Sequence, residues 1–513
     1  MRRALSILIV LSVLMGACSG SDEVDSSSGG LADLVGGRSA DEPVDDDPSD
    51  GRDEAGSTAS GEIDWVDADD GWQEGFLAVP LDHDDPDGPT IDVAVVRHAA
   101  EDPERRIGPL LINPGGPGAA GIEYAYYGEL IFDEEIVERF DIVGFDPRGV
   151  GDSTNVTCGD DEFMDDFTAA DPVPDSPEES AQVQTLIEEY AANCEAESSE
   201  LLPYLDTVST AKDMDLIRQA LGDDQITYLG FSYGTFLGAT YLELFGEHTR
   251  AAVLDGAYSR SLTPLEMTQG QAAGFEHTLD AFLSWCQRET CDYSGSDDPE
   301  AALFGLLDSI DARPLPTDDE RDLTVGLAWT GLIQALYGEA LWPGLDQALA
   351  EARQQKDGSG LLALADQYNN RSLDGSYDSS GPAFISISCM DSEGTDDLDA
   401  SSIAAQVVAA APRIGPVFTA MPGPCDYWPV VADAPTGPWS APDAPPVIVV
   451  ATTGDPATPY EWGVRAAEEL ETATLITVEG DSHTAYWGGN SCVDDAIDTY
   501  LLELVMPDEG TRC

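Results

Sequence analysis

Residues 226–240 read Ile-Thr-Tyr-Leu-Gly-Phe-Ser-Tyr-Gly-Thr-Phe-Leu-Gly-Ala-Thr, and this stretch decides the fold that we expect. An apolar, β-branched run ends at Ser232, which has Gly230 and Gly234 on either side, and residues with helical spacing follow at once. Flanking glycines permit a tight strand-to-helix turn that holds the serine hydroxyl out into a cleft. The first N–H groups of the new helix have no intrahelical partner, so they face any negative charge that develops beside the serine. The pattern predicts a nucleophile elbow.

Two later segments supply the partners that a catalytic serine needs. The predicted strand at 447–451 runs into the turn that contains Asp455, and the predicted strand at 475–478 runs into the turn that contains His483. Because the carboxyl ends of parallel strands meet at one edge of a sheet, both side chains should lie at the edge that carries Ser232. The chain order Ser, Asp, His is that of the α/β-hydrolases. We therefore expect a catalytic triad of these three residues.

Each residue of the predicted site has a chemical reason. A serine hydroxyl is a poor nucleophile until an imidazole takes its proton, which is the role of His483. Asp455 would accept a hydrogen bond from the other ring nitrogen and stabilise the imidazolium. The oxyanion hole would use the N–H of Tyr233 and a glycine N–H from the loop after residues 109–113, for which we select Gly116.

Structural alternatives stay open at three points. The serine motif also fits any strand followed by a helix in a parallel sheet, and the glycines at 115–118 could form only a tight turn. Asp455 could be a turn residue before Pro456, in which case Asp481 would be the acid. The remaining histidines are expected to be structural or exposed, and they are His83, His98, His248 and His277.

The order of predicted elements indicates the fold class. Strands that alternate with helices predict a mostly parallel central sheet covered on both faces, which antiparallel strands at 75–81 and 90–98 precede. We expect an α/β-hydrolase core at 61–260 and 446–513, with a largely helical cap at 261–445 inserted before the strand that leads to the acid. Helical periodicity dominates the cap at 271–286, 301–307, 325–349 with a break at Pro343, and 401–411.

The charge of the chain excludes some partners. The formal net charge is −77, from 22 Lys and Arg against 99 Asp and Glu. Such a surface repels phosphate, so nucleic acid is not an expected partner. The acids are dispersed along the whole chain, which favours a solvated surface suited to salty surroundings, where screening acts over ~10 Å or less. The chain has neither a calcium-loop pattern nor a C-x-x-C pair, so we expect no metal and no cofactor.

The N-terminus predicts export. Two arginines precede an apolar run at 4–14 and small residues before Cys18, which predicts a signal peptide over residues 1–17. Residues 15–18 resemble the lipobox of bacterial lipoproteins, and this implies a lipidated Cys18 and attachment to the outer face of the cell membrane, with secretion as the alternative. Residues 18–60 carry almost no bulky apolar side chain after the cysteine, so they are expected to be a disordered acidic tether.

The cysteine count agrees with an exported protein. If Cys18 carries lipid, an even number remains, which argues for four disulfides. We expect sequence neighbours to pair among Cys158, Cys194, Cys286, Cys291, Cys389, Cys425, Cys492 and Cys513.

Several motifs occur together in the chain. They are Gly-Gly-Pro-Gly at 115–118, Asp-Pro-Arg-Gly-Val-Gly-Asp-Ser at 146–153, the serine elbow, Gly454-Asp455-Pro456, and the tail from Ser482-His483-Thr484 through Ser491-Cys492 to Cys513. With this combination, residues 61–513 resemble the secreted bacterial tripeptidyl aminopeptidases, which belong to the prolyl-aminopeptidase group of α/β-hydrolase serine peptidases. Pro114 stands where prolyl aminopeptidases usually carry histidine, which favours the tripeptidyl branch.

The resemblance implies hydrolysis of peptide bonds near a free N-terminus. Such an exopeptidase must bind the substrate ammonium, and a carboxylate in a sheltered cleft is its natural partner. Asp391 or Glu393 in the late cap is the candidate, although both could be merely solvated.

Three functions follow. The first is a lipid-anchored, exported serine aminopeptidase that releases tripeptide-like N-terminal peptides through an acyl-enzyme. The second is a carboxylesterase that uses the same triad on acyl esters, because only the cap would choose the substrate. The third is a solute-binding lipoprotein with an inactive hydrolase fold. The sequence leaves the oligomeric state open.

Overall fold

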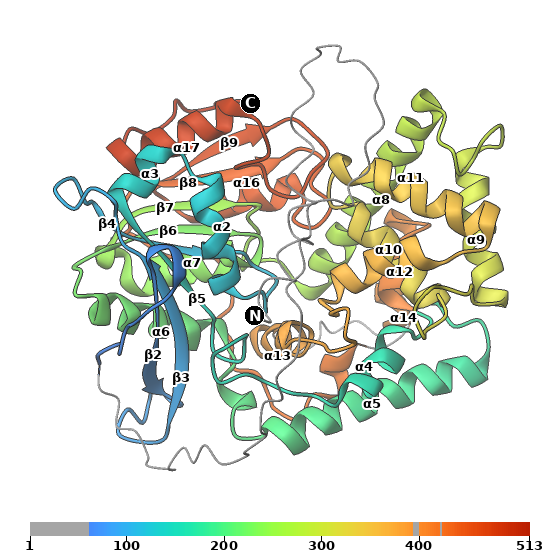
Figure 1. Cartoon of the computed structure of the whole chain (residues 1–513), viewed down its shortest axis with the longest axis horizontal. Helices are drawn as coiled ribbons and strands as arrows, with labels where there is room; N and C mark the ends of the chain where they lie inside the picture. The colour runs from blue at the N-terminus through green and yellow to red at the C-terminus, as the bar shows by residue number, and fades with distance from the viewer. Residues whose placement is uncertain (1–60, 393–399, 421–422) are drawn as a thin grey trace, which may run out of the picture.

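A nine-stranded sheet forms the centre of the computed structural model, which describes residues 61–392, 400–420 and 423–513 (Figure 1). The strand order is β1-β2-β3-β5-β4-β6-β7-β8-β9. The first three strands are antiparallel to their neighbours, and β5, β4, β6, β7, β8 and β9 run parallel. The strands are β1 (Val66–Asp67), β2 (Trp72–Pro80), β3 (Thr90–His98), β4 (Gly108–Asn113), β5 (Phe140–Phe145), β6 (Ile226–Phe231), β7 (Thr249–Asp255), β8 (Val447–Thr452) and β9 (Ala473–Val478).

Helices cover both faces of the sheet. Every residue of β4, β5, β6 and β8 is buried, because apolar side chains point to both faces and each face needs a cover. One apolar cluster joins α2, α3 and α17 to the sheet, and another joins α6, α7 and α16 to it. These helices are α2 (Gly121–Ile131), α3 (Glu134–Arg139), α6 (Thr207–Leu221), α7 (Tyr233–Phe245), α16 (Tyr460–Glu469) and α17 (Ser491–Glu503). The predicted mostly parallel sheet is confirmed.

A helical region lies beside the sheet, between β7 and β8 in the chain (Figure 1). It has its own apolar core, in which Phe282, Leu303 and Trp342 are almost fully buried. The expected break near Pro343 lies slightly earlier, because this proline stands in the first turn of α11, where its missing N–H costs nothing. The helices are α8 (Pro264–Glu289), α9 (Pro299–Ala312), α10 (Val325–Ala335), α11 (Trp342–Ala350), α12 (Ser359–Tyr368), α13 (Ser380–Asp391), α14 (Ala400–Ala410) and α15 (Gly415–Thr419).

Three helices cross the division between sheet and cap that the sequence predicts. Ala383, Ile387 and Met390 of α13 belong to the apolar cluster of the sheet, although α13 lies in the cap segment. Conversely, α4 (Asp161–Thr168) and α5 (Pro177–Ser198) precede the cap in sequence but contact it. Asp165 of α4 accepts a hydrogen bond from the cap's Arg371 at 2.7 Å, and α5 lies against cap residues 424–427. Helical periodicity in the sequence could not reveal these contacts, because it indicates that a helix has an apolar face and not which neighbour covers that face.

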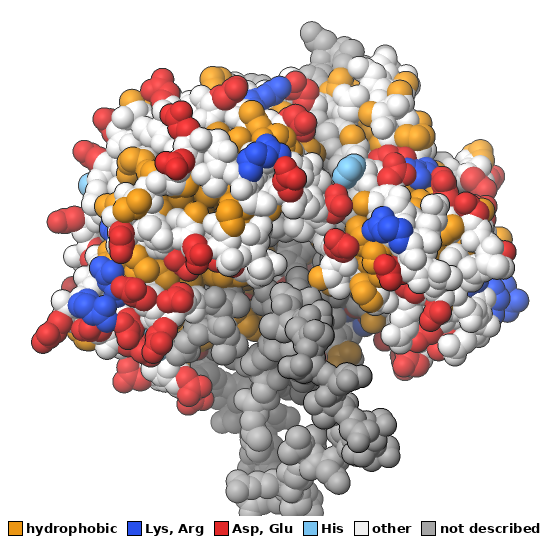
Figure 2. Space-filling view, turned by 90° about the horizontal axis from the view of Figure 1, so that it is seen from above, with side chains coloured by type: hydrophobic (Ala, Val, Ile, Leu, Met, Phe, Trp, Pro, Cys, Tyr) orange, Lys and Arg blue, Asp and Glu red, His pale blue; other side chains and the backbone are white. Residues whose placement is uncertain are grey.

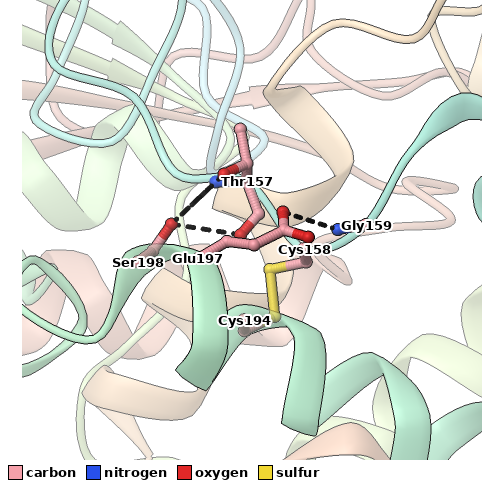
Figure 3. The surroundings of a disulfide bond; sticks show 6 residues. All are labelled: Thr157, Cys158, Gly159, Cys194, Glu197 and Ser198. Atoms are coloured by element: carbon pink, nitrogen blue, oxygen red, sulfur yellow. Dashed lines mark hydrogen bonds between the residues drawn. A yellow bond between two sulfur atoms is a disulfide. The ribbon is translucent and has the colours of Figure 1, made fainter.

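Four disulfides join the described cysteines, and each joins sequence neighbours as expected. They are Cys158–Cys194, Cys286–Cys291, Cys389–Cys425 and Cys492–Cys513. Figure 3 shows the first of them beside hydrogen bonds that tie the same two segments, where Ser198 Oγ accepts from Thr157 N at 3.0 Å and Glu197 accepts from Gly159 N at 3.1 Å. The predicted signal peptide, Cys18 and the tether lie outside the described residues.

The acidic excess is visible on the surface of the described residues. Figure 2 shows Asp and Glu side chains spread over one face among fewer Lys and Arg side chains. Within the described ranges, no group of three or more His, Cys, Asp or Glu residues is arranged to hold a metal ion. No helix in the described part of the chain is long and apolar enough to cross a membrane.

Candidate active site

Ser232 stands in the strained turn that the sequence predicts. It is the N-cap of α7, with φ 53° and ψ −123°, and such a conformation costs a non-glycine residue about 1–3 kcal/mol. A Cβ on Gly230 would lie 2.4 Å from the carbonyl oxygen of Gly234, and a Cβ on Gly234 would lie 2.6 Å from that of Asn113. The two flanking glycines are therefore required by close packing, which holds the serine in its turn.

Asp455 and His483 form a hydrogen-bonded pair at the ends of β8 and β9. The Nδ1 atom of His483 lies 2.9 Å and 3.0 Å from the two carboxylate oxygens of Asp455. Asp455 is only 2 % exposed. Because a carboxylate can only accept, Nδ1 carries the proton, and Nε2 is left as the basic nitrogen of the ring.

The turn after β8 holds Asp455 in place. Its carboxylate accepts hydrogen bonds from Ala457 N, Thr458 N and Thr458 Oγ1, each at 2.9 Å. The sequence alternative, Asp481, instead lies 3.0 Å from Nε2 of His277 on α8. Of the two acids, the structure thus brings Asp455 to His483.

Electrostatics favour the protonated form of His483. Burial disfavours the imidazolium, but the charge and hydrogen bond of Asp455 outweigh burial, and the charge of Asp255 adds to them, so the pKa of His483 is raised above 6.5. A base with a raised pKa holds a proton more readily once it has taken it from a nucleophile.

The turn after β7 connects His483 with Ser232. The carbonyl oxygen of Asp255 accepts from Ser232 N at 2.9 Å, while its carboxylate accepts from Ala485 N at 2.9 Å and Tyr486 N at 2.8 Å. A Cβ on Gly256, the next residue, would lie 3.2 Å from Cε1 of His483. The serine and histidine turns are therefore both hydrogen-bonded to Asp255, and Gly256 leaves room for the imidazole. Burial raises the pKa of the Asp255 carboxyl to about 6.

The glycine loop after β4 lies directly over the elbow. A Cβ on Gly115 would lie 3.0 Å from Cβ of Ser232 and 3.1 Å from the backbone nitrogen of Tyr233. Gly116, with φ 102°, follows in this loop, and Tyr233 is the first residue of α7. The N–H groups of both residues have no intramolecular acceptor among the described residues. The loop that contains Gly116 is thus packed against Ser232 and the backbone nitrogen of Tyr233.

Asp391, the last residue of α13, reaches the side chain of Tyr233 through Thr207. Its carboxylate accepts from Thr207 N at 2.9 Å and Thr207 Oγ1 at 2.6 Å, and the same hydroxyl bonds to the phenol of Tyr233. Burial raises the pKa of Asp391 to about 7, against the hydrogen bonds from Thr207, and the charge of Asp206 adds to the rise. The other candidate, Glu393, lies outside the described residues.

The cap also contacts the histidine turn. His483 N donates to the carbonyl oxygen of Tyr337 at 2.8 Å, and the Tyr337 ring lies edge-on to the imidazole with centroids 5.5 Å apart. Gly338 and Ser482 form an antiparallel bridge beside this contact. Tyr337 lies between α10 and α11 in the chain, so a cap connection orients the imidazole that β9 delivers.

Four residues that contact the candidate site were not singled out from the sequence. Asp255 and Thr458 had a signal: Asp255 ends the apolar run at 251–255, and Thr458 lies three residues after Asp455, where an Asx turn places a donor. Thr207 and Tyr337 had none, because their contacts join segments that are far apart in the chain.

The remaining histidines contact residues other than Asp455 and His483. The Nε2 atom of His83 lies 2.9 Å from Asp213, within the buried Arg148 cluster, and the His98 ring packs 5.4 Å from Trp72. His248 is partly exposed, and His277 bonds to Asp481 as described.

Two family descriptions match the chain. The family described as alpha/beta hydrolase fold matches residues 108–305, and the family described as TAP-like protein matches residues 411–513. Together with the sheet and the Ser, Asp, His arrangement, these matches define the class of the protein, and the predicted α/β-hydrolase fold is confirmed.

Curated relatives are similar over most of their length. Serine protease Hip1 of Mycobacterium tuberculosis is 37 % identical over 454 residues, which cover 86 % of each chain. Carboxylesterase B of the same species is 40 % identical over 453 residues, which cover 85 % of each chain. Tripeptidyl aminopeptidase of Streptomyces lividans is 30 % identical over 475 residues, which cover 87 % of this chain and 86 % of the relative. The chain therefore belongs to the tripeptidyl-aminopeptidase-like family of α/β-hydrolases, and it is a serine hydrolase.

Proposed function

We propose that this protein is an aminopeptidase that releases short, tripeptide-like N-terminal peptides through an acyl-enzyme. Ser232 attacks the scissile carbonyl, and Nε2 of His483 takes the hydroxyl proton and later gives it to the leaving amine. Asp455 keeps the proton of His483 on Nδ1 and stabilises the imidazolium. Water then attacks the acyl-enzyme by the same route, with His483 as the base.

The two unpartnered N–H groups would stabilise the oxyanion. The tetrahedral intermediate places negative charge beside Ser232, where the N–H groups of Tyr233 and Gly116 can donate to it. One donor of this kind contributes about 3–4 kcal/mol to transition-state stabilisation. The donors are fixed in advance by the first turn of α7 and by the glycine loop, so they need no reorganisation during the reaction.

The position of Asp391 is the observation that favours a peptidase with a free amino terminus. This half-buried carboxylate lies two hydrogen bonds from the phenol of Tyr233, the residue after the proposed nucleophile. An ammonium group at Asp391 would gain a charge-assisted hydrogen bond in a sheltered place. It would also oppose the effect of burial on the pKa of Asp391, because a neighbouring positive charge favours the carboxylate.

A comparison of three substrates tests this proposal. Wild-type enzyme and Ser232→Ala would be assayed with a tripeptide p-nitroanilide that has a free amino terminus, with the same compound acetylated, and with a short p-nitrophenyl ester. We expect Ser232-dependent turnover of the free peptide and a large loss on acetylation. Asp391→Asn should lower kcat/KM for the free peptide about 10- to 100-fold, as loss of a hydrogen bond to a charged group does.

The second candidate is a carboxylesterase with the same proposed triad. The 40 % identity to carboxylesterase B favours it, because the proposed triad chemistry serves both substrates. In the same assay, strong ester cleavage with indifference to acetylation would establish the esterase. Turnover that survives Ser232→Ala would refute both candidates.

We further propose that the protein is exported and anchored through a lipid on Cys18. The apolar run at 4–14 and the lipobox-like residues 15–18 support this proposal. With a flexible tether, the catalytic domain would stand ~35 Å from the membrane. Cys18→Ser should move the protein from the membrane fraction to the medium or the soluble fraction, whereas an unchanged membrane fraction would refute the anchor.

A further inference from the structure

Three helices meet at Tyr233, Thr207 and Asp391. Tyr233 opens α7, Thr207 opens α6, and Asp391 ends α13. Tyr233 is 3 % exposed and Thr207 is 1 % exposed. The backbone of Tyr233 faces the proposed oxyanion, while its phenol points into this buried junction. One residue therefore joins the two parts of the proposed site.

The number of protons sets the direction of the hydrogen bonds. An ionised Asp391 can only accept, so the single proton of Thr207 Oγ1 is donated to it. The oxygen of Thr207 can then only accept from the phenol of Tyr233, whose pKa is raised well above 10 by burial. With Asp391 ionised, the side-chain hydrogen bonds form one hydrogen-bond chain, in which Tyr233 donates to Thr207 and Thr207 donates to Asp391.

A protonated Asp391 permits the opposite direction. Its new O–H can donate to Thr207 Oγ1, which can then donate to the oxygen of Tyr233. The first arrangement ends on a charge, and hydrogen bonds to charged groups are about twice as strong as neutral ones. A charged Asp391 therefore holds Tyr233 more firmly than a neutral one.

The charges around Asp391 are few. The negative charge of Asp206 acts on it, and Asp391 in turn acts on Tyr233 and Tyr258. Asp206 is already occupied at the start of α6, where it accepts from Ser209 N at 2.8 Å and Ser209 Oγ at 2.7 Å. No arginine, lysine or histidine among the described residues pairs with Asp391. An ammonium group of the substrate would therefore give Asp391 a positively charged partner, which the described residues do not supply.

We propose that Thr207 is a positioning residue that couples amine binding at Asp391 to the oxyanion donor of Tyr233. An ammonium at Asp391 keeps the carboxylate charged. The hydrogen-bond chain then keeps its stronger direction, from Tyr233 through Thr207 to Asp391. Tyr233, and with it the first N–H of α7, is then held where the intermediate forms. The amino terminus of the substrate thus raises kcat as well as affinity, so that binding energy remote from the scissile bond is used in the transition state. This inference rests on the proposed aminopeptidase function.

Kinetics with matched peptides test the coupling. The measured quantity is the ratio of kcat for the free tripeptide anilide to kcat for its acetylated form. Thr207→Val keeps the shape and removes the hydroxyl, and we expect the ratio to fall about tenfold, which corresponds to one hydrogen bond of about 1.4 kcal/mol. In Thr207→Ser, which keeps the hydroxyl, the ratio should be close to that of wild type. Ser209→Ala, which removes a hydroxyl from the same helix start without touching Asp391, should leave the ratio as in wild type.

A double variant sharpens the test. Once Asp391→Asn has removed the charge, Thr207→Val should have little further effect on the ratio, because the two residues belong to the same hydrogen-bond chain and their effects are not additive. Titration of active sites with a fluorophosphonate counts the folded enzyme, so partial unfolding does not enter kcat. If Thr207→Val fails to fold, Thr207→Ser and Tyr233→Phe carry the test, and Tyr233→Phe should lower the ratio.

The outcomes separate the two proposals. An equal loss of kcat for both peptides in Thr207→Val, or a change in KM alone, would overturn the coupling while the aminopeptidase stands. A wild-type enzyme that cleaves both peptides equally would overturn the aminopeptidase itself.

Discussion

The sheet and the cap contribute to the site in different ways. The sheet supplies Ser232, Asp455 and His483, each in the turn directly after a parallel strand. The cap supplies Tyr337 and Asp391, one from a connection between helices and the other from a helix end. Backbone register positions the first set, whereas contacts between segments that are far apart in the chain position the second. Under the proposed roles, the reactive groups depend on the sheet, and substrate selection depends on how the cap is fastened to it.

The largest expected effect comes from the sheet. Asp455→Asn should lower kcat about 10⁴-fold for peptides and esters alike, because an amide leaves His483 in the wrong tautomer. Steady-state kinetics with both substrates would measure it. Asp481→Asn is the matched control, and it should stay within a few-fold of wild type. A tenfold loss or less in Asp455→Asn would exclude this residue as the acid.

The next effect comes from the fastening of the cap. The disulfide Cys389–Cys425 holds α13 two residues before Asp391 and closes a loop with a sequence separation of 36. Replacing both cysteines by serine should lower the free energy of unfolding by about 2–4 kcal/mol. Denaturant titration would measure this loss. We also expect kcat/KM to fall more for free peptides than for esters. Equal loss for both substrates would show that α13 does not serve selection.

The pH profile should distinguish the two regions. His483 must be neutral to act as a base, and its pKa is raised, so kcat/KM should rise with pH through a midpoint above about 6.5 for every substrate. Asp391, with a pKa of about 7, must be ionised for the ammonium. The free peptide should therefore show a steeper acid limb than the ester, and Asp391→Asn should remove the difference. Parallel limbs in wild type would contradict an amine site at Asp391.

The smallest expected effect is that of salt on stability, and it should concern the sheet and the cap alike. With 99 acidic against 22 basic residues, repulsion between surface carboxylates opposes folding at low ionic strength. Screening shortens this repulsion to about 3 Å at 1 M salt. The melting temperature should therefore rise by a few degrees from dilute buffer to molar salt, and differential scanning calorimetry would measure it. Constant stability over this range would show that the charges are already balanced by their neighbours.

The sheet strands and their turns could be predicted from residues in sequence. The apolar run before Ser232 and the glycines around it dictate both the strand and the turn, because a Cβ at either glycine would meet backbone oxygen. Strands β8 and β9 are also short apolar runs that end in an acid or histidine turn. Cap helices were predicted less completely, since α12, α13 and α15 lack a clear start or period that distinguishes them.

The sequence by itself determined that a serine, an acid and a histidine stand at strand ends in the hydrolase order, and that neighbouring cysteines can pair. Only the tertiary structure decided that Asp455 and not Asp481 reaches His483, that α13 packs on the sheet, and that Thr207 joins Asp391 to Tyr233. The physical reason is the range of the interactions. Local sterics and hydrogen bonds fix a turn within a few residues, whereas the partner of a side chain is selected by the packing of segments that are distant in the chain, such as Thr207 and Asp391, which lie 184 residues apart.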